Sequence, residues 1–426
     1  MIVERQPDRR RFLHAGAVGL AGVWGFGACS RRESSSDSPQ SGRKPVTRTL
    51  GRTGLRLPIV SMGTAYAANL VHAALAGGMR YVHTSSSYAE RNHEILLGRV
   101  FRGRARDSFI VATSPDLPYR DDRTGIGTMD LGTMADVRLI GESLDGSLRR
   151  LGLDAVDIYY LGSIGRRETA LHEPYLRAFE ALKKAGKARF VGVTTHSHEP
   201  EVIRAVVESG VWDVVLTSYN FRQSHREEVR AAIRHAAAAG LGIVAMKTQA
   251  GVYWDSARTK KINMKAALKW VLQDENVHTT VPAISNFDEL REDLSVMEDP
   301  TLTPDERRDL RLGAELGLSG LYCQQCGTCR PQCPAGLDIP TLMRSYMYAA
   351  GHQQPSKARL TLSGWTPADL ACRTCDHCDV RCALGFDVRA RALQMAGLLE
   401  NTDAPPVGVS PWPDRDPGPS PGCAHG

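Results

Sequence analysis

A repeating unit, in which a short β-rich run is followed by a turn and a helical segment, begins at residue 47. The eight β-rich runs are PIVSMG (58–63), RYVHT (80–84), SFIVAT (108–113), VDIYYL (156–161), RFVGVT (189–194), WDVVLT (212–217), GIVAMK (242–247) and HTTVPA (278–283). Amphipathic helical stretches separate them, for example residues 139–152, 175–188 and 226–240. Eight such pairs over roughly 240 residues predict a (β/α)₈ barrel. A doubly wound open sheet is the alternative, but no G-x-G-x-x-G follows the first run.

Chemistry in a (β/α)₈ barrel takes place at the C-terminal ends of the strands. Sequence order places eight polar or small residues at that end: His83, Tyr88, Ser114, Gly162, His196, Tyr219, Asn220 and Lys247. The connection after the third run, residues 114–136, is long for a βα loop, and we interpret it as a lid or a docking surface.

Two cysteine runs, CQQCGTCRPQCP (323–334) and CRTCDHCDVRCA (372–383), share the spacing C-x-x-C-x-x-C-x-x-x-C. They contain eight of the ten cysteines, and Cys29 and Cys423 are the other two. Three thiolates at two-residue intervals hold three corners of one 4Fe–4S cube, and the fourth reaches a neighbouring cluster. The spacing therefore predicts two 4Fe–4S clusters with exchanged ligands. The first cluster would be held by Cys323, Cys326, Cys329 and Cys382, and the second by Cys372, Cys375, Cys378 and Cys333.

Zinc and disulfides are the alternatives for these cysteines. Two C-x-x-C pairs satisfy one zinc ion, which leaves the further cysteine of each run unexplained. Adjacent C-x-x-C loops are also poor frameworks for disulfide pairing. Iron–sulfur ligation is the interpretation that uses all eight side chains.

The N-terminus reads as a targeting segment rather than as part of the fold. Arg9 and Arg10 precede Phe12, Leu13 and a short apolar run (15–29), as in a bacterial twin-arginine export signal. An ordinary secretory signal is the alternative. Cys29 ends the run as FGAC, so either a lipidated, membrane-attached form or a soluble periplasmic form is open.

Composition divides the rest of the chain. We expect a signal peptide (1–29), a flexible linker (30–46), the barrel (47–297), a linker helix (298–320), an α-rich ferredoxin-type domain (321–400) and a disordered tail (401–426). The net charge of +6 is small for 426 residues. We expect no dense Lys/Arg face, and nucleic-acid binding is not predicted.

The chain resembles an aldo/keto reductase fused to a ferredoxin-type domain. The segments that carry this resemblance are RTLGRTGLRLPIVSMGTA (48–65), GGMRYVHTSSSYAERNHEILLGRV (77–100), ISNFDELREDL (284–294) and the cysteine runs. The first segment is similar to the opening hairpin and first strand of that barrel. The second is similar to its second strand and catalytic loop.

The resemblance implies a catalytic tetrad of Asp, Tyr, Lys and His. The tyrosine falls on Tyr88, while the other three positions hold His83, Ser114 and Gly162. A buried Lys without its carboxylate partner would destabilise the fold. It is therefore consistent that both the Asp and the Lys are absent. Without them a tyrosine is a weak proton source at neutral pH. We expect Tyr88 and His83 to carry whatever chemistry remains in this loop.

The resemblance also implies an NADP(H) site, and its features survive in part. Tyr219 corresponds to a tyrosine that stacks on nicotinamide, and Asn220 is its neighbour. Ser285 and Asn286 begin a helix whose free N–H groups suit a phosphate. Arg291 would reach a ribose phosphate, and Lys247 on an apolar strand calls for an anion. Structural roles compete for most of these residues: Tyr219 as a core aromatic, Ser285 as a helix cap and Arg291 as a solvated charge.

The sequence thus predicts an exported iron–sulfur oxidoreductase. In it electrons would move between two 4Fe–4S clusters and a substrate, or a bound nicotinamide, at the barrel mouth. The alternative is a non-catalytic electron-transfer or docking protein whose barrel is a scaffold. Either way the expected partner is a redox protein or a small molecule.

Overall fold

The computed structural model describes residues 44–115, 119–120, 133–134, 137–255, 257–318, 320–351, 355–362 and 365–400. All of them belong to one compact unit that begins at Lys44. The predicted export signal (1–29), the linker up to residue 43 and the tail (401–426) lie outside the described residues. So does most of the long loop 114–136.

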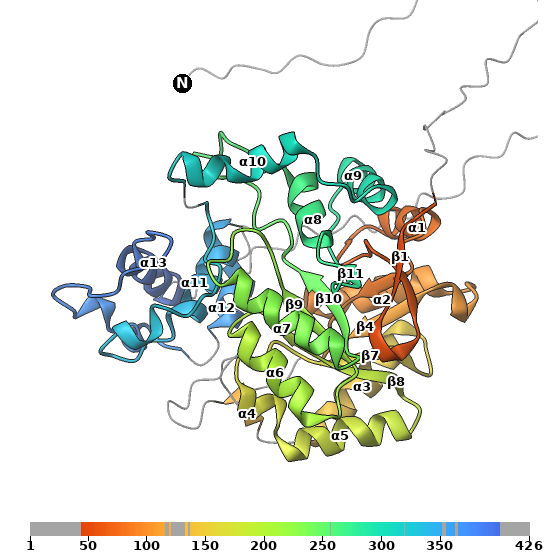
Figure 1. The fold of residues 1–426 in the computed structure, drawn as a ribbon. Coiled ribbons are helices and arrows are strands. Elements are labelled where there is room, and N and C mark those ends of the chain that lie inside the picture. Colours follow the sequence, from red (N-terminus) through yellow and green to blue (C-terminus); the bar gives the residue numbers. More distant parts are fainter. Residues whose placement is uncertain are drawn as a thin grey trace, which may run out of the picture. The chain divides into compact units, whose positions relative to one another are not determined.

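Seven parallel strands form one sheet in the order β11-β10-β9-β8-β7-β4-β3 (Figure 1). Their bounds are β3 Tyr81–His83, β4 Ile110–Thr113, β7 Val156–Leu161, β8 Ala188–Thr195, β9 Val214–Ser218, β10 Gly242–Met246 and β11 Thr279–Thr280. The first predicted run joins both edges, because Val60 bridges Thr280 and Met62 bridges Val82, both in parallel. The ring is therefore closed, and the predicted (β/α)₈ barrel is confirmed.

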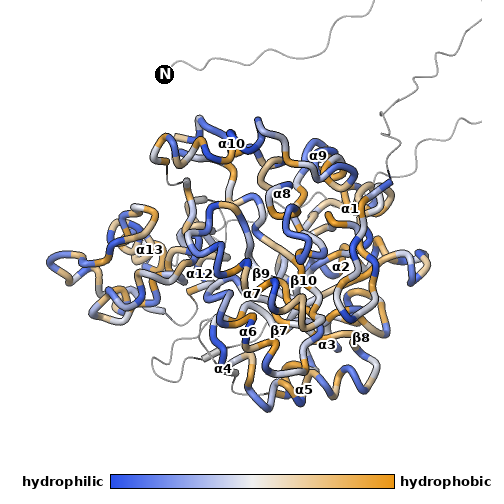
Figure 2. The backbone as a smooth tube through the Cα atoms, in the orientation of Figure 1, coloured by the Kyte–Doolittle hydropathy of each residue, from blue (hydrophilic) through white to orange (hydrophobic). Residues whose placement is uncertain are grey.

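The helices of the barrel follow its strands and cover the outside of the ring. They are α1 Ala68–Ala76, α2 Asn92–Phe101, α3 Arg138–Leu151, α4 Arg167–Ala170, α5 Glu173–Lys184, α6 Glu199–Ser209, α7 Arg226–Ala238, α8 Met264–Leu272 and α9 Phe287–Glu298. Hydrophobic and hydrophilic residues alternate along these outer helices (Figure 2). One face of each helix can therefore pack on the apolar strands.

The strands are buried on both faces, as expected for a parallel sheet that helices cover. The barrel interior is filled in part by Tyr81 and Tyr160, whose hydroxyl oxygens lie 3.0 Å apart. Gly192 makes room for them, because a Cβ there would stand 2.7 Å from the Tyr160 ring and 2.6 Å from the Val214 carbonyl oxygen. Side chains thus form a packed core inside the ring.

A hairpin of β1 (Thr47–Thr49) and β2 (Arg56–Pro58) closes the N-terminal end of the barrel. Its turn lies against the start of β10, where a Cβ on Gly242 would meet the Leu50 side chain at 2.6 Å. Two short strands, β5 (Tyr119–Arg120) and β6 (Thr133–Met134), pair within the long loop after β4.

Helix α10 (Pro304–Glu315) follows the barrel, as the sequence predicts. Thr303 and Glu306 form a reciprocal capping box at its start, which satisfies two backbone donors. Lys269 of α8 donates to the Glu306 carboxylate at 2.8 Å, so α10 is held to the barrel by a partly buried ion pair.

The cysteine-rich segment packs α11 (Ile339–Tyr346), α12 (Pro355–Thr361) and α13 (Val388–Glu400) around a second core. This core combines Leu342, Met343, Trp365 and Met395 with the Cys329 side chain. Among the described residues, no helix is both long and apolar enough to cross a membrane.

Candidate functional site

The catalytic-loop residues gather at the C-terminal ends of β3, β4 and β7. The backbone N–H of Ser86 donates to the Ser114 carbonyl at 2.9 Å, which joins the loop after β3 to the end of β4. Gly162 follows β7, and a Cβ placed on it would lie 3.7 Å from the Ser114 Cβ. The structure therefore brings His83, Ser114 and Gly162 to one end of the barrel.

His83 is a buried imidazole at the end of β3, with 6% of its surface exposed. Its Nε2 has no hydrogen-bond partner among the described residues. Its ring meets those of Tyr88 and Tyr160 edge-on, at 6.0 and 5.8 Å between centroids. Burial, and then the neighbouring His93, lower the pKa of His83 to about 4. His83 is neutral at pH 7.

Tyr88 begins a 3-10 turn, Tyr88–Arg91, and is half-buried. Burial raises its pKa above the usual range, and the nearby Tyr348 and Tyr66 add to the shift. Tyr88 is therefore a protonated hydroxyl at neutral pH and a weak acid.

The carboxylate of Glu94, which follows this loop on α2, is already used for packing. It is fully buried and accepts hydrogen bonds from Thr113 Oγ1 and Arg150 Nε, both at 2.7 Å. It ties α2 to β4 and α3. Glu94 positions the loop and is not a free base.

Lowered pKa values at the barrel mouth give the protein a pH-dependent stability. Burial also lowers the pKa of His93 to about 4. Between pH 6.5 and pH 4 the unfolded chain binds protons that the native His83 and His93 do not, so stability falls as the pH falls through this range. We expect urea unfolding to show a loss of roughly 1.4 kcal/mol per pH unit for each histidine. The variant His83→Gln should show a smaller loss between pH 7 and pH 5, and an equal loss would contradict the assignment.

Tyr219 and Asn220 take part in internal contacts. The Tyr219 hydroxyl accepts a hydrogen bond from Arg230 Nε at 2.9 Å, and its ring packs 5.2 Å from that of Trp270. Asn220 Nδ2 lies 3.2 Å from the carbonyl oxygen of Lys247, which is exposed after β10 with φ +55°. Tyr219 is fully buried, so its ring belongs to the packed layer around the barrel.

Ser285, Asn286 and Arg291 lie together at the start of α9. Asn286 Oδ1 accepts from the N–H groups of Asp288 and Glu289, both at 2.9 Å. The Glu289 carboxylate accepts from the Ser285 N–H at 2.6 Å, and Arg291 pairs with Asp288. These donors are satisfied within the helix start, and two carboxylates stand beside them.

The first group of cysteines combines three from one run with one from the other. Burial, followed by the charges of Cys382 and Cys326, raises the pKa of Cys323 to about 11. Burial, followed by the charges of Cys323, Cys326 and Cys382, raises that of Cys329 to about 12. Cys323 and Cys329 therefore each interact electrostatically with Cys326 of the same run and with Cys382 of the other.

The second group has the reciprocal composition. Burial, followed by Cys333, Cys378 and Cys375, raises the pKa of Cys372. Cys333 belongs to the first run and the other three to the second. The fold thus brings each fourth cysteine to the opposite run.

The surroundings of these thiols fit a thiolate-bound cluster. The backbone N–H of Gln325 donates to Cys323 Sγ at 3.3 Å, and that of Leu384 donates to Cys382 Sγ at 3.4 Å. Such donors stabilise negative sulfur and tune cluster potentials. Among the described residues, no three potential ligands converge closely enough for a single ion. A 4Fe–4S cube spreads its thiolates over its corners, so convergence on one point is not required.

The first cysteine run contacts the mouth of the barrel. Gln324 Oε1 accepts from Asn220 Nδ2 at 3.2 Å, just beyond β9. Arg330 Nη1 lies 3.2 Å from the His198 ring nitrogens, just beyond β8. Tyr348, which follows α11, is close enough to Tyr88 to affect its pKa.

Sequence reasoning missed this contact surface. Four residues that form it, His198, Gln324, Arg330 and Tyr348, are at no defining position of a motif in the sequence. The positive φ of His198, +52°, marks an unusual backbone that no sequence pattern reveals.

Comparison with known proteins agrees with this architecture. Residues 50–266 match the Aldo/keto reductase family, and residues 322–387 match a 4Fe-4S dicluster domain. A barrel with such a domain defines an iron–sulfur oxidoreductase class. The chain belongs to the aldo/keto reductase family.

Individual relatives are distant. The uncharacterized oxidoreductase YrpG of Bacillus subtilis is 26% identical over 219 residues, which cover 47% of this chain and 66% of that protein. This chain therefore spans slightly less than two thirds of that relative. The holo form of aldo-keto reductase AKR11C1 from Bacillus halodurans is 22% identical with a TM-score of 0.50, and the match covers 63% of this chain and 96% of that one. This likeness shows the fold.

Proposed function

We propose that the protein is an exported iron–sulfur oxidoreductase that moves electrons between two 4Fe–4S clusters and a substrate at the barrel mouth. The observation that carries the proposal is the contact of Gln324 and Arg330 with Asn220 and His198, at 3.2 Å in each case. It sets the first ligand loop against the end of the barrel where aldo/keto reductases react. When bound, the clusters would supply electrons one at a time.

Residues of the protein itself would donate and accept the protons. Reduction of a carbonyl to an alcohol takes up two electrons and two protons. The Tyr88 hydroxyl and the neutral His83 imidazole lie edge to face at the mouth. The raised pKa of Tyr88 keeps its hydroxyl protonated, and the lowered pKa of His83 leaves one ring nitrogen without a proton, so the pair would hold a proton and a site that can accept one, although each group is a weak acid or base. His83 Nε2 is one of several buried polar atoms here, with Ser86 Oγ and His93 Nε2, that have no hydrogen-bond partner within the described residues.

The standard carbonyl-reductase mechanism is disfavoured. The tetrad pattern is degenerate, with His83, Ser114 and Gly162 where the resemblance implies Asp, Lys and His. Ser114 offers no cation to lower the pKa of Tyr88, and burial raises that pKa instead. Gly162 offers no side chain to polarise a substrate carbonyl.

The start of α9 and Tyr219 offer little that would bind NADP(H). The donors at the start of α9 are bound to Asn286 and Glu289, and Asp288 and Glu289 would repel a phosphate. Tyr219 is enclosed by packing. We therefore propose a site that works with the clusters and does not depend on a resident nicotinamide.

Anaerobic purification with cofactor analysis tests this composition. We expect about eight iron and eight sulfide per chain, and no stoichiometric nicotinamide. Zinc without sulfide would contradict the clusters. One NADP(H) per chain would contradict the nicotinamide-independent site.

Export and membrane attachment rest on the sequence. Arg9 and Arg10 before an apolar run support twin-arginine export of the folded, cluster-loaded protein, and Cys29 supports a lipid anchor. The substrate side would then face the periplasm, with a redox protein or a small molecule as partner.

The variant Arg9→Lys/Arg10→Lys should stay in the cytoplasm with its clusters. Unimpaired export in cell fractionation would remove this proposal, and fatty-acid labelling of Cys29→Ala tests the anchor.

The alternative is a non-catalytic electron-transfer or docking protein. The raised pKa of Tyr88 and the missing assistance from Ser114 and Gly162 favour it. In that case the contacts to the cluster domain would serve assembly only.

A further inference from the structure

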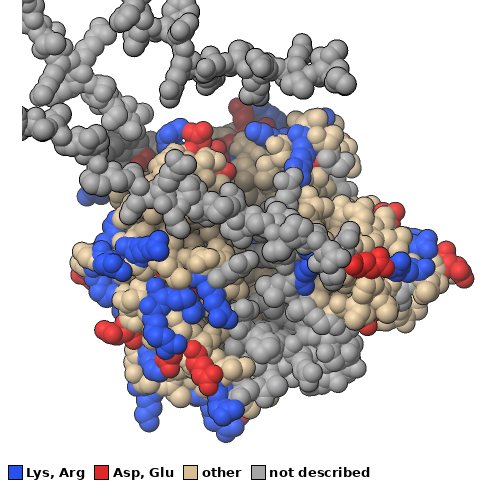
Figure 3. All heavy atoms as spheres, turned by 180° about the vertical axis from the view of Figure 1, so that it is seen from behind, with Lys and Arg blue, Asp and Glu red and all other residues tan. Residues whose placement is uncertain are grey.

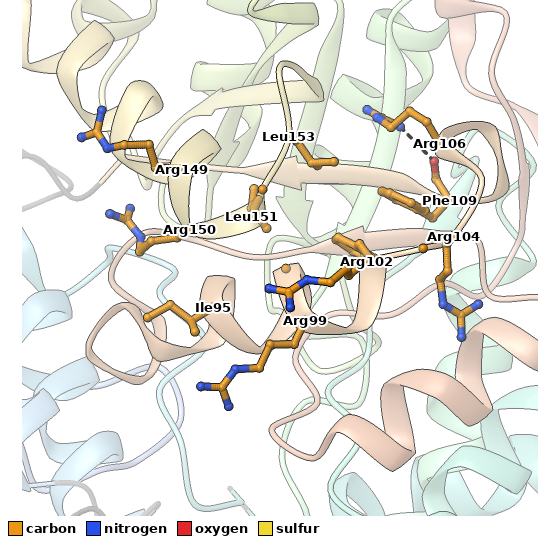
Figure 4. A pocket seen from close by; sticks show the side chains of 14 residues that line it. Ile95, Arg99, Arg102, Arg104, Arg106, Phe109, Arg149, Arg150, Leu151 and Leu153 are labelled. Carbon is orange, nitrogen blue, oxygen red and sulfur yellow. Dashed lines mark hydrogen bonds between the residues drawn. The ribbon is translucent and has the colours of Figure 1, made fainter.

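An arginine-rich cavity of about 410 Å³ lies between the C-terminal ends of α2 and α3 (Figure 4). Six arginines line it: Arg99, Arg102, Arg104, Arg106, Arg149 and Arg150. Both helices lead from here into the starts of strands β4 and β7. The cavity is therefore at the end of the barrel opposite the mouth, and it is separate from the site described above.

Two of these arginines are neutralised by buried carboxylates. Arg106 pairs with Asp157 at 2.8 Å, and Arg150 pairs with Glu94 at 2.7 Å. The guanidinium of Arg104 contacts the Val100 carbonyl and the His72 ring, which are uncharged acceptors.

The other cations have no compensation in the described part of the chain. Arg99, Arg102 and Arg149 are exposed, and their side chains form no ion pair or hydrogen bond with the described residues. With Arg104, four guanidinium groups without a carboxylate surround one cavity. Figure 3 shows Lys and Arg side chains gathered on the side of the molecule that carries these helices. The expectation of no dense cationic face is wrong at this place.

Helix dipoles account for only part of this charge. A helix C-terminus carries about half a negative charge, so α2 and α3 together offset about one cation. Arg102 and Arg104 follow the end of α2, where the dipole effect fades. A net positive potential remains around the cavity, and it would attract an anion.

The floor of the cavity is apolar. Phe101 and Phe109 stack at 4.0 Å between centroids, and Ile95 at the rim is 37% exposed. Leu151 and Leu153 complete the floor. A ligand that fits has an anionic head and an apolar body.

We propose that this cavity binds a phosphate ester. The guanidinium groups of Arg99, Arg102 and Arg149 contact the phosphate, because their planar forks match its oxygens. The apolar body of the ligand lies on Phe101 and Ile95. A phospholipid headgroup and a soluble phosphate ester share this chemistry.

The test uses the full-length protein and the variant Arg99→Gln/Arg102→Gln/Arg149→Gln. One arm measures sedimentation with phosphatidylglycerol–phosphatidylcholine vesicles and with phosphatidylcholine vesicles alone. The other arm measures calorimetric binding of glycerol 3-phosphate and of inorganic phosphate. We expect binding in at least one arm, weakened roughly a hundredfold in the variant, about fivefold for each cation.

A charge-matched control separates a site from a general electrostatic effect. Arg177→Gln/Arg204→Gln/Arg234→Gln removes the same charge from exposed positions on α5, α6 and α7, and it should bind like the wild type. Binding by vesicles alone identifies a lipid headgroup, and binding of glycerol 3-phosphate identifies a soluble ester. No binding in either arm, or equal losses in the two triple variants, would overturn the proposal.

Discussion

Replacing Cys382 by Ser is expected to reduce the iron content of the anaerobically purified protein from about eight to about four per chain. The cluster lost should be the one bound by the first cysteine run, although Cys382 belongs to the second. The reason is that Cys382 interacts with the first run. Its charge contributes to the raised pKa values of Cys323 and Cys329. A removed thiolate leaves one corner of the cube without its ligand.

Double variants reveal which cluster is affected. If Cys382 and Cys326 hold the same cluster, Cys382→Ser/Cys326→Ser loses no more iron than either single variant. Cys382→Ser/Cys375→Ser should lose both clusters. Ligation without exchange between the runs predicts the reverse pattern, so iron analysis with electron paramagnetic resonance decides between them.

Cys423→Ser is the matched control, because this cysteine is outside the two runs and outside the described residues. It should retain about eight iron per chain. Circular dichroism should show that the barrel stays folded in each variant, since its core is separate from the core of the cysteine-rich domain.

The barrel could be predicted from sequence because its strands are continuous apolar runs. VDIYYL and GIVAMK, for example, become β7 and β10. A parallel strand buried on both faces shows this pattern whatever its neighbours are. The closure of the ring follows from the number of such units. The pairing of cysteines across the two runs is predicted from their spacing and stays a prediction; in the structure the charge of Cys382 acts on Cys323 and Cys329, and that of Cys333 acts on Cys372.

The contact between the two domains could not be predicted in this way. Gln324, Asn220 and His198 are ordinary polar residues, and their partners lie about a hundred residues away. The arginine cavity is similar, because residues 99–106 and 149–150 meet only when α2 packs on α3. No periodic pattern within one segment of the sequence predicts which residues of distant segments come into contact.

The start of α9 shows why one motif had two interpretations. Ser285-Asn286 before an acidic turn suits a phosphate site and a helix cap equally well in sequence. In the structure Asn286 caps the helix and occupies the N–H groups that a phosphate would need. Only the side-chain direction distinguishes the two roles.

Tyr88→Phe and His83→Ala are each expected to lower the rate of cluster-dependent turnover at the barrel mouth by about two or more orders of magnitude, because each variant removes a group that takes part in proton transfer. We propose the hydroxyl and the imidazole, whose rings meet edge-on at the end of β3, as the groups that carry the protons. Phenylalanine keeps the ring and removes only the hydroxyl, so packing is conserved. If Tyr88→Phe keeps full activity, the loop has no part in the chemistry and the scaffold alternative is favoured.

The most direct measurement compares two electron donors on the same panel of aldehydes and ketones. Wild-type protein, Tyr88→Phe, His83→Ala and the cluster-deficient Cys382→Ser are each assayed with reduced methyl viologen and with NADPH. We predict turnover with reduced methyl viologen in the wild type, its loss in all three variants, and little turnover with NADPH. Robust NADPH turnover that Tyr88→Phe abolishes and Cys382→Ser leaves unchanged would contradict the account and indicate a standard carbonyl reductase.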